Sequence, residues 1–428
     1  MPIKSKKLPH IIRSLRNRNY SLFFASLCIS QVGLWMQRVA MGWLVYRLTD
    51  STGALGVIDF IGAVPTVILI PLTGYLLPKF DPRSVLLVTQ SLLMSSAALL
   101  GALTLTGYAS YTWLLQIALV MGVINAFDSP IRQSIVVKLV DHKEDVSNAV
   151  ALNSSVFNAA RLIGPSIAGV VIGRVGEGVC FLLNAASYFA TIFAVKAIKI
   201  TGAPEKAAGG KRESLLERFR VLRRFPPFAY VLTLVSIAGV FGVPYLALMP
   251  AMARTVLGGT SRTMGLLLMA VGVGALAGSL LMAARKSPVG LDRWAIRCSL
   301  AFGVSVSIFA LSRSVGMAMI LGAPVGFFMV TALISCNTFL QTMVDDEHRS
   351  LMMSLYVAAV TGIAPVGSII IGQLAEMIGT SGALCVSGMI CVAASLYFSR
   401  KLDSCRTMIL RNLKARGFPL KDGFRWEK

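Results

Sequence analysis

The stretch Val156-Phe-Asn-Ala-Ala-Arg-Leu-Ile-Gly-Pro-Ser-Ile-Ala-Gly169 is apolar apart from one charge and two small polar side chains. Arg161 lies inside it, and Gly164 and Pro165 follow within about one helical turn. A bilayer-buried arginine costs at least ~2.5–3.5 kcal/mol on insertion scales, so such a charge usually faces a protein interior or a water-filled cavity. The Gly-Pro pair and Gly169 allow a kink and close helix approach. The stretch therefore predicts a membrane-spanning helix with a functional face.

The composition agrees with a membrane protein, because the 428-residue chain is 55% hydrophobic and only 14% charged, and its mean hydropathy is +0.72. These values exclude an ordinary soluble domain. A transmembrane helix needs about 20 apolar residues. Twelve such runs can be identified, at 20–47, 53–77, 84–107, 111–138, 147–173, 178–198, 228–256, 264–284, 294–312, 315–343, 350–374 and 382–399. Their continuity excludes a β-barrel. We predict an all-α integral membrane protein with twelve transmembrane helices.

The formal net charge of +22 suggests nucleic acid at first sight. However, the basic segments 1–18, 79–83, 196–224, 285–297 and 400–428 all fall on one side of the membrane if the N-terminus is cytoplasmic. The positive-inside rule explains this bias without a nucleic-acid partner. We therefore expect cytoplasmic N- and C-termini, anionic lipid at the basic cytoplasmic segments, and a multi-pass location in a bacterial cytoplasmic (inner) membrane.

The chain divides into two halves of six helices. We expect a basic cytoplasmic N-terminal arm at 1–18, the first half at 19–198, a cytoplasmic linker with an amphipathic helix at 199–227, the second half at 228–399 and a basic cytoplasmic tail at 400–428. Pro165 follows Ser154 at the spacing with which Pro365 follows Ser354, which indicates an internal repeat. Two six-helix halves related in this way describe one large class of transporters that work by rocking.

Neither the cysteines nor the histidines indicate a reactive or metal site. Seven cysteines are scattered without a CxxC pair, and the three histidines fall in predicted loops or in the N-terminal arm. This pattern predicts no disulfide framework and no metal centre. The sequence offers no Ser/His/Asp set and no phosphate-binding glycine loop placed to work, so we expect neither an enzyme nor a bound cofactor.

Polar residues within the predicted spans recur at helical spacing and form stripes. Stripes of this kind should face a cavity or partner helices rather than lipid. The candidate cavity-lining residues are Gln31, Trp35, Asn125, Ser154, Asn158, Asn337, Thr338 and Gln341, and the candidate buried or proton-coupling charges are Arg38, Asp59, Asp128, Arg132 and Arg161.

Depth in the membrane suggests which charges meet, because residues equidistant from a hairpin turn lie at similar depth. Asp128 and Arg161 are symmetric about the loop between the fourth and fifth spans, and Arg38 and Asp59 are symmetric about the outer turn between the first two. Either pair could be a fixed ion pair that makes a buried charge tolerable. Alternatively, the carboxylate could switch between a protonated and an arginine-paired state and couple proton flow to substrate movement. Both interpretations remain open.

Three blocks of the first half resemble the major facilitator superfamily, and within it the exporters of drugs and siderophores, such as the enterobactin exporter and macrolide efflux proteins. They are 33–49, 125–133 and 160–169, and the segments 346–349 and 362–367 extend the resemblance into the second half. It implies proton-driven export by alternating access, with the first, fourth, seventh and tenth helices lining the cavity. It further implies that Gly164, Pro165 and Gly169 act like the antiporter motif, which seals against leak.

The loop between the second and third spans departs from the superfamily pattern Gly-x-x-x-Asp-Arg-x-x-Arg-Arg. Here it reads Gly74-Tyr-Leu-Leu-Pro-Lys-Phe-Asp-Pro-Arg83, so Pro78 stands at the aspartate position. The usual cytoplasmic lock is therefore weakened or replaced, with Asp81 as the substitute. We assign Gly74, Lys79, Asp81 and Arg83 to this gating loop.

Together these features predict a monomeric secondary active transporter. It exports a small amphipathic molecule, drug-like or siderophore-like, from the cytoplasm by proton-coupled alternating access, with the proton gradient as its energy source and no cofactor. Two alternatives stay open. One is an uptake permease for a small metabolite, and the other is a non-transporting membrane sensor or assembly factor on the same fold.

Overall fold

The computed structural model describes residues 10–140, 143–198, 225–285, 287–345 and 348–416, and every regular element among them is helical. Eleven of these helical stretches are long and apolar enough to cross a membrane. The last, Leu351–Ser404, has 54 residues and contains a non-helical position at Gly379, where φ is 78° and ψ is 159°. Glycine adopts positive φ without a Cβ clash, so this long stretch consists of two helical lengths. The prediction of an all-α multi-pass membrane protein is confirmed.

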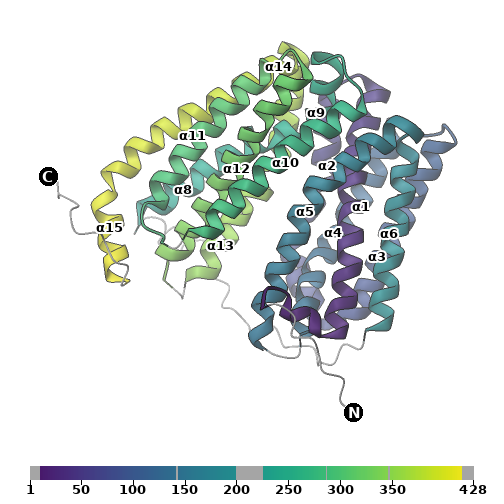
Figure 1. The fold of residues 1–428 in the computed structure, drawn as a ribbon, viewed down its shortest axis with the longest axis horizontal. Helices are drawn as coiled ribbons and strands as arrows, with labels where there is room; N and C mark the ends of the chain where they lie inside the picture. Colours follow the sequence, from purple (N-terminus) through teal and green to yellow (C-terminus); the bar gives the residue numbers. More distant parts are fainter. Residues whose placement is uncertain (1–9, 141–142, 199–224, 286, 346–347, 417–428) are drawn as a thin grey trace. The chain divides into compact units, whose positions relative to one another are not determined.

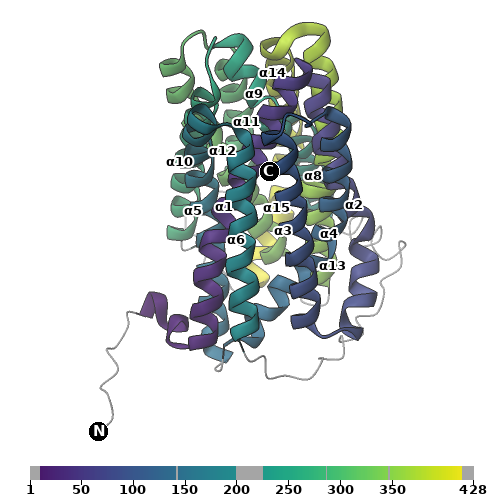
Figure 2. The same ribbon diagram turned by 90° about the vertical axis from the view of Figure 1, so that its right-hand side faces the viewer.

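The chain forms two compact units. Unit 1 comprises residues 1–50, 58–210 and 259–269. Its helices are α1 (Arg18–Thr49), most of α2 (Thr52–Leu76), η2 (Leu77–Lys79), α3 (Pro82–Leu105), α4 (Tyr111–Lys138), α5 (Lys143–Val175) and α6 (Glu177–Ala197), preceded by η1 (His10–Arg16). Within the unit, α1 packs on α5 and α6, and α3 packs on α4 and α6 (Figures 1 and 2).

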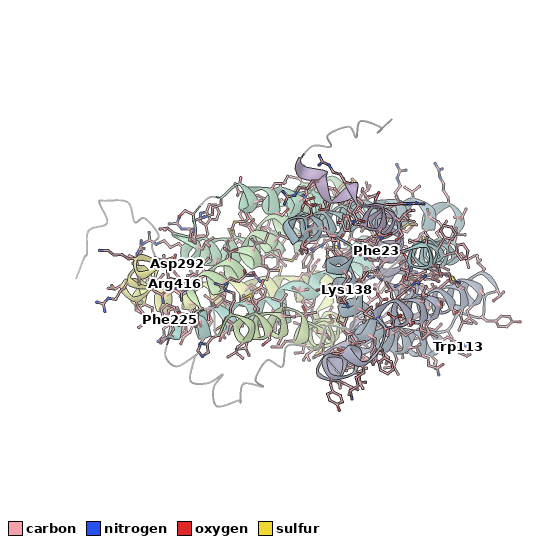
Figure 3. All side chains as sticks on the ribbon, turned by 90° about the horizontal axis from the view of Figure 1, so that it is seen from below. Phe23, Trp113, Lys138, Phe225, Asp292 and Arg416 are labelled. Carbon is pink, nitrogen blue, oxygen red and sulfur yellow. The ribbon has the colours of Figure 1, made fainter. Side chains whose placement is uncertain are left out.

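Apolar side chains fill the end of unit 1 where η1 lies. Phe23 and Leu86 are buried in this cluster, whereas Trp113 is 46% exposed at the edge of the same unit (Figure 3). The Tyr20 hydroxyl donates a hydrogen bond to the Ala149 carbonyl oxygen at 2.9 Å. A buried phenol needs such a partner, and this bond ties the start of α1 to α5.

Unit 2 comprises residues 51–57, 211–258 and 270–428. Its described helices are α8 (Pro226–Ile237), η3 (Ala238–Gly242), η4 (Val243–Leu246), α9 (Met249–Ala251), η5 (Met252–Val256), most of α10 (Ser261–Ala284), α11 (Leu291–Ala310), α12 (Val315–Met343), α13 (Arg349–Val357), η7 (Ala358–Gly362), α14 (Ala364–Ser404) and α15 (Arg406–Ala415). Helix α11 packs on α12 and α14, and α8 packs on α14. The segments η3, η5 and η7 are single π-helical turns, a feature that is frequent at functional sites.

Two short segments fall outside the predicted halves. Residues 51–57, at the start of α2, belong to unit 2, and residues 259–269, at the start of α10, belong to unit 1. Each segment contacts its own unit at a glycine: Gly56 contacts Ser368, and Gly265 contacts Pro165. A Cβ on Gly56 would lie 2.2 Å from the Ser368 carbonyl oxygen, and one on Gly265 would lie 2.8 Å from the Pro165 carbonyl oxygen. Real Cβ atoms do not approach that closely, so these backbones touch only because the side chains are absent.

The parts of the terminal segments that the structure describes are held by polar contacts. In the N-terminal arm, Arg13 forms a salt bridge of 2.8 Å with Asp145, and the Ser14 hydroxyl donates to Asn148 Oδ1 at 2.7 Å. At the other end, Arg416 forms a salt bridge of 2.5 Å with Asp345. Most of the predicted linker helix, at 199–224, lies outside the described residues.

Candidate functional site

The carboxylate of Asp128, on α4, lies in a dense polar network although it is only 2% exposed. Thr89 Oγ1 and Gln90 Nε2, both on α3, donate to Asp128 Oδ1 at 2.8 and 2.6 Å. Arg132, one turn further along α4, donates from Nε at 3.2 Å and Nη2 at 2.5 Å to Oδ2. A buried carboxylate is tolerated when it is both paired and hydrogen-bonded, and this network meets both conditions.

The ion-pair partner of Asp128 in the structure is Arg132. Arg161, the candidate that similar depth in the membrane suggested, does not form this salt bridge. Depth fixes the height of a residue in the membrane but not the direction in which its side chain leaves the helix. Residues at i and i+4 share one face of a helix, so Arg132 reaches the carboxylate from its own helix.

Arg161 instead belongs to a cluster around Trp35. The guanidinium carbon of Arg161 lies 5.9 Å from the Trp35 ring centroid, and that of Arg38 lies 5.1 Å from it. Phe157 meets the same indole edge-on, with centroids 5.9 Å apart and planes at 68°. Both cations are within the range in which the electron-rich face of an indole attracts a positive charge.

Gly164 explains how this cluster forms between α1 and α5. A Cβ on Gly164 would lie 2.5 Å from the Trp35 Cβ, so only glycine lets Trp35 pack against α5 at this point. Phe157, Arg161 and Gly164 are spaced i, i+4 and i+7 and share one face of α5, which explains why all three meet the same residue.

Two polar atoms near this cluster have no hydrogen-bond partner among the described residues: the Oε1 of Gln31 and the Nε1 of Trp35. Gln31 is 8% exposed. Arg38, by contrast, is exposed in the middle of α1. The charges of Asp59 and Arg161 both act on Arg38, the first favourably and the second unfavourably. Arg38 and Asp59, the second predicted pair, are thus in electrostatic range.

The other candidate cavity residues bond mainly within their own helices. Asn158 Nδ2 donates to the Ser154 carbonyl oxygen at 3.0 Å, and both side chains are exposed on α5. In unit 2, Gln341 Nε2 donates to Asn337 Oδ1 at 2.6 Å, and Thr338 is half-buried on the same helix, α12. Asn125 is half-buried on α4.

Sequence reasoning missed the residues that support the buried charges. Thr89 and Gln90, which hold Asp128, stand side by side with Ser91 between the apolar segments 85–88 and 92–94. Asn184 on α6 donates to Gln37 Oε1 on α1 at 2.6 Å, in a second buried contact. The polar residues of the third and sixth predicted spans, Thr89, Gln90 and Asn184, were the signal that could have identified these contacts.

The gating-loop residues have separate local roles. Asp81 caps the start of α3, because its Oδ2 accepts from the Ser84 backbone N–H at 2.9 Å and from the Ser84 hydroxyl at 2.8 Å. These bonds hold the pKa of the Asp81 carboxyl below its usual value. Arg83 donates to the carbonyl oxygens at the end of α6, and the Lys79 ammonium lies 3.8 Å from the Tyr75 ring centroid. Gly74 lies near the end of α2.

The antiporter-like block continues from Gly164 to the start of α10. Pro165 lies inside α5, and a Cβ on Gly169 would lie 2.9 Å from the Ser261 carbonyl oxygen. The Ser261 hydroxyl donates to the Gly169 carbonyl oxygen at 3.3 Å. Gly164 and Gly169 therefore both serve close backbone approach, one toward α1 and one toward α10.

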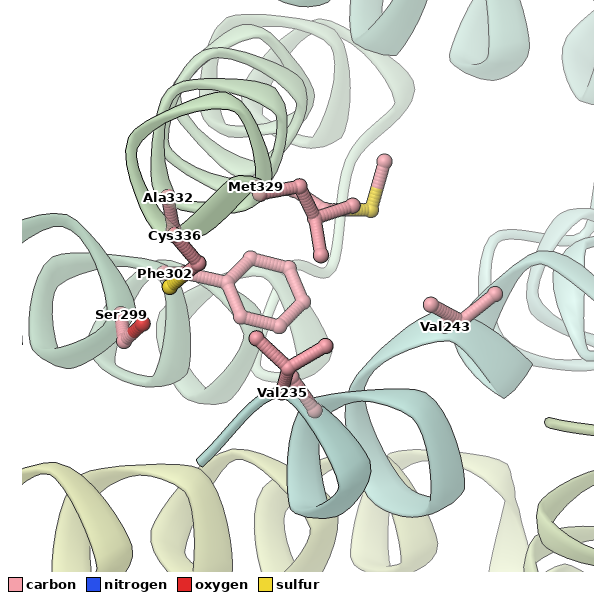
Figure 4. Close-up of a pocket in the computed structure, with 9 residues that line it drawn as sticks. Val235, Val243, Ser299, Phe302, Met329, Ala332 and Cys336 are labelled. Atoms are coloured by element: carbon pink, nitrogen blue, oxygen red, sulfur yellow. The ribbon is translucent and has the colours of Figure 1, made fainter. Parts of the chain in front are cut away.

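Unit 2 contains a small apolar cavity of about 20 Å³ beside η3, close to the space that a single water needs. Val235, Phe302, Met329 and Cys336 are among the side chains around it (Figure 4). A pocket for a drug-sized ligand has several hundred Å³, so this cavity is too small for one in the conformation described.

Comparisons with known proteins support a transporter. A family model described as "transmembrane secretion effector", from the major facilitator superfamily, matches residues 12–413. The staphyloferrin A transporter of Staphylococcus aureus (strain NCTC 8325 / PS 47) is 25% identical over 386 residues, covering 89% of this chain and 96% of the relative. The multidrug efflux pump Tap of Mycolicibacterium fortuitum is 22% identical over 368 residues, covering 84% and 89%.

Solved structures share the fold. The nucleoside transporter NupG superposes with a TM-score of 0.68 at 11% identity, covering 89% of this chain and 98% of that one. The D-xylose-proton symporter superposes with a TM-score of 0.69 at 13% identity, covering 89% and 97%. At identities this low, the superpositions show only that the fold is shared. The family model matches well over half of the chain, and the resemblance of its first-half blocks is confirmed: this protein belongs to the transmembrane secretion effector family of the major facilitator superfamily.

Proposed function

We propose that this protein is a secondary active transporter that exports a small amphipathic molecule, drug-like or siderophore-like, from the cytoplasm by proton-coupled alternating access. The relative named as a multidrug efflux pump supports export, and the relative named as a staphyloferrin A transporter supports a small-molecule cargo. The proton gradient is the energy source, so the protein needs no bound cofactor and performs no enzymatic reaction.

One observation carries the proton coupling: the carboxylate of Asp128 is buried in a membrane-spanning helix and forms an ion pair with Arg132. Protonation would cancel the carboxylate charge and free Arg132 to interact elsewhere. A group that changes partner when it gains a proton is what a proton-coupled transporter requires. Thr89 and Gln90 hold the carboxylate in place during the exchange.

We further propose twelve membrane crossings, with Gly379 marking the outer turn between the last two. An even number of crossings places both basic termini in the cytoplasm, where the positive-inside rule favours them. The protein would then act as a monomer in the bacterial inner membrane, with anionic lipid at its basic segments and with no nucleic-acid partner.

The test uses everted membrane vesicles from cells that express the chain, energised by an imposed pH gradient. The amphipathic dye Hoechst 33342 and the hydroxamate siderophore desferrioxamine serve as probes. We expect at least one probe to accumulate in the everted vesicles and to be released by nigericin. Accumulation in right-side-out vesicles instead would indicate an uptake permease, and binding without any movement would indicate a sensor.

The role of Asp128 is separated from folding by a second assay on the same vesicles. Asp128→Asn should abolish accumulation driven by the pH gradient but retain exchange of labelled for unlabelled probe without a gradient. Asp50→Asn, at the end of α1, is the matched control, since asparagine tolerates the left-handed backbone at that position (φ 48°). If Asp128→Asn loses gradient-driven accumulation and exchange together, or retains both, the coupling role is wrong.

A further inference from the structure

We infer that Arg38, Arg161, Trp35 and Gln31 form a binding site for the carboxylate groups of an anionic molecule with an apolar body. This inference deepens the proposed function, because it rests on the chain being a transporter and names the chemical class of its cargo. All four residues belong to unit 1 and lie on two helices that pack directly together, α1 and α5.

The charge of this cluster favours an anionic ligand. Two guanidinium groups are held on one indole, with carbons 5.1 and 5.9 Å from the ring centroid, and their like charges repel each other. Asp59 acts on Arg38 and offsets one of the two positive charges. One positive charge therefore remains over the three groups, inside the membrane-spanning part of the protein. A bound anion would relieve both the repulsion and the excess charge.

The hydrogen-bonding groups of the cluster favour the same kind of ligand. Trp35 Nε1 is a buried donor and Gln31 Oε1 a buried acceptor, and neither has a partner among the residues that the structure describes. An unsatisfied buried polar group costs about 1–3 kcal/mol. Gln31, Trp35 and Arg38 are spaced i, i+4 and i+7, so they lie along one face of α1. A carboxylate oxygen accepts from Trp35, and a hydroxyl on the same ligand donates to Gln31.

The exposure and the shape of the cluster also fit such a ligand. Arg38 and Phe157 are both exposed, although each lies well inside a membrane-spanning helix. An arginine in such a position faces a water-filled cavity rather than lipid. Guanidinium groups bind carboxylates through paired N–H bonds, and the neighbouring Phe157 ring, 46% exposed, offers apolar surface to the rest of the ligand. The site thus combines two anion-binding groups with an aromatic wall.

The test measures binding to the purified full-length protein in detergent micelles by isothermal titration calorimetry. The probes are 2,6-naphthalenedicarboxylate, its dimethyl ester and 2,6-diaminonaphthalene, which share a ring system and differ in charge. We expect the dicarboxylate to bind and the ester and amine to bind at least tenfold more weakly. Equal affinity for the acid and its ester would overturn the inference.

Variants then assign the site. Arg38→Gln and Arg161→Gln should each weaken dicarboxylate binding at least tenfold. Arg47→Gln is the matched control, because Arg47 is also on α1 but is paired with Glu177 at 2.8 Å, toward the end of the helix. It should bind like the wild type. Unchanged affinity in both Arg38→Gln and Arg161→Gln would place the anion elsewhere and sink the proposal.

Lysine variants distinguish loss of binding from loss of folding, and vesicle export distinguishes failure of this inference from failure of the proposed function. Arg38→Lys and Arg161→Lys keep the charge but lose the paired N–H geometry, so they should fold and bind with intermediate affinity. If they bind no better than the glutamine variants, the guanidinium charge is not what recognises the probe. If the wild-type vesicles export Hoechst 33342 but the wild-type protein does not bind the dicarboxylate, export stands and the anionic cargo is refuted.

Discussion

The salt bridge between Asp128 and Arg132 predicts a strong, non-additive effect on stability. Its side chains are 3% and 16% exposed, so both charges are buried. Removing one partner of a buried pair leaves the other charge uncompensated, at a cost of about 3–5 kcal/mol. We therefore expect Asp128→Asn and Arg132→Gln each to lower the free energy of unfolding by about that amount.

The double variant Asp128→Asn/Arg132→Gln should lose less than the sum of the two single losses, because it leaves no unpaired charge. Coupled residues show interaction energies of about 0.5–3 kcal/mol. Neutral hydrogen bonds between membrane helices average only about 0.6 kcal/mol in such cycles. A charge pair with hydrogen bonds from Thr89 and Gln90 should exceed that average, so we expect a coupling of about 2 kcal/mol.

The measurement is unfolding of the purified protein by sodium dodecyl sulfate titration in mixed micelles, followed by circular dichroism. A second cycle joins Asp128→Asn to Arg161→Gln, whose contacts with Trp35 are separate from the Asp128 network. That cycle should be additive within about 0.5 kcal/mol. A coupling below about 0.5 kcal/mol between Asp128 and Arg132, or a larger one between Asp128 and Arg161, would refute the assignment of partners.

Three further substitutions test the local packing and capping. Gly164→Leu should unfold or strongly destabilise the protein, by about 3 kcal/mol or more on thermal denaturation, because its Cβ would overlap Trp35 and the rest of the leucine side chain would add to that overlap. Gly56→Leu should abolish transport in vesicles, since its Cβ would overlap the Ser368 carbonyl oxygen, whereas Gly316→Ala, with open space around it, should not. Asp81→Ala should lower the free energy of unfolding by about 0.5–2 kcal/mol through loss of the helix cap. The pKa of the Asp81 carboxyl is lower in the folded protein than in the unfolded chain. The stabilisation from this cap is therefore present above the unfolded-state pKa and is lost as the pH falls through the folded-state pKa.

The membrane-spanning helices could be predicted from sequence because each depends on a local property, about 20 consecutive apolar residues. The predicted span 111–138 and the observed helix Tyr111–Lys138 coincide, and Ser110, whose side chain accepts from the Trp113 N–H, explains the start. The last two spans were predicted separately, and Gly379 is the residue at which their helical geometry is interrupted. A turn made by one glycine leaves both helices intact on either side.

Contacts between helices were harder to predict, because they depend on the rotation of each helix about its axis. Asn125, Asp128 and Arg132 stand at i, i+3 and i+7 and so share one face of α4. This spacing does not show that Thr89 and Gln90 of α3 contact Asp128. The exchange of residues 51–57 between the predicted halves has the same origin. The glycines of α2 predict close contact with another helix, but their spacing does not identify which helix it is.

Arg161 and the Gly164-Pro165 break, which the sequence presents as two separate anomalies, have one physical explanation. Without Gly164, the Trp35 side chain could not approach α5, since a Cβ there would lie 2.5 Å from that of Trp35. Once the indole is seated, the two residues one and two turns earlier on the same face, Arg161 and Phe157, necessarily contact it. The glycine therefore positions the charge. A substitution at Gly164 small enough to fold, such as Gly164→Ala, should displace Arg161 from the ring and weaken anion binding without removing any charged group.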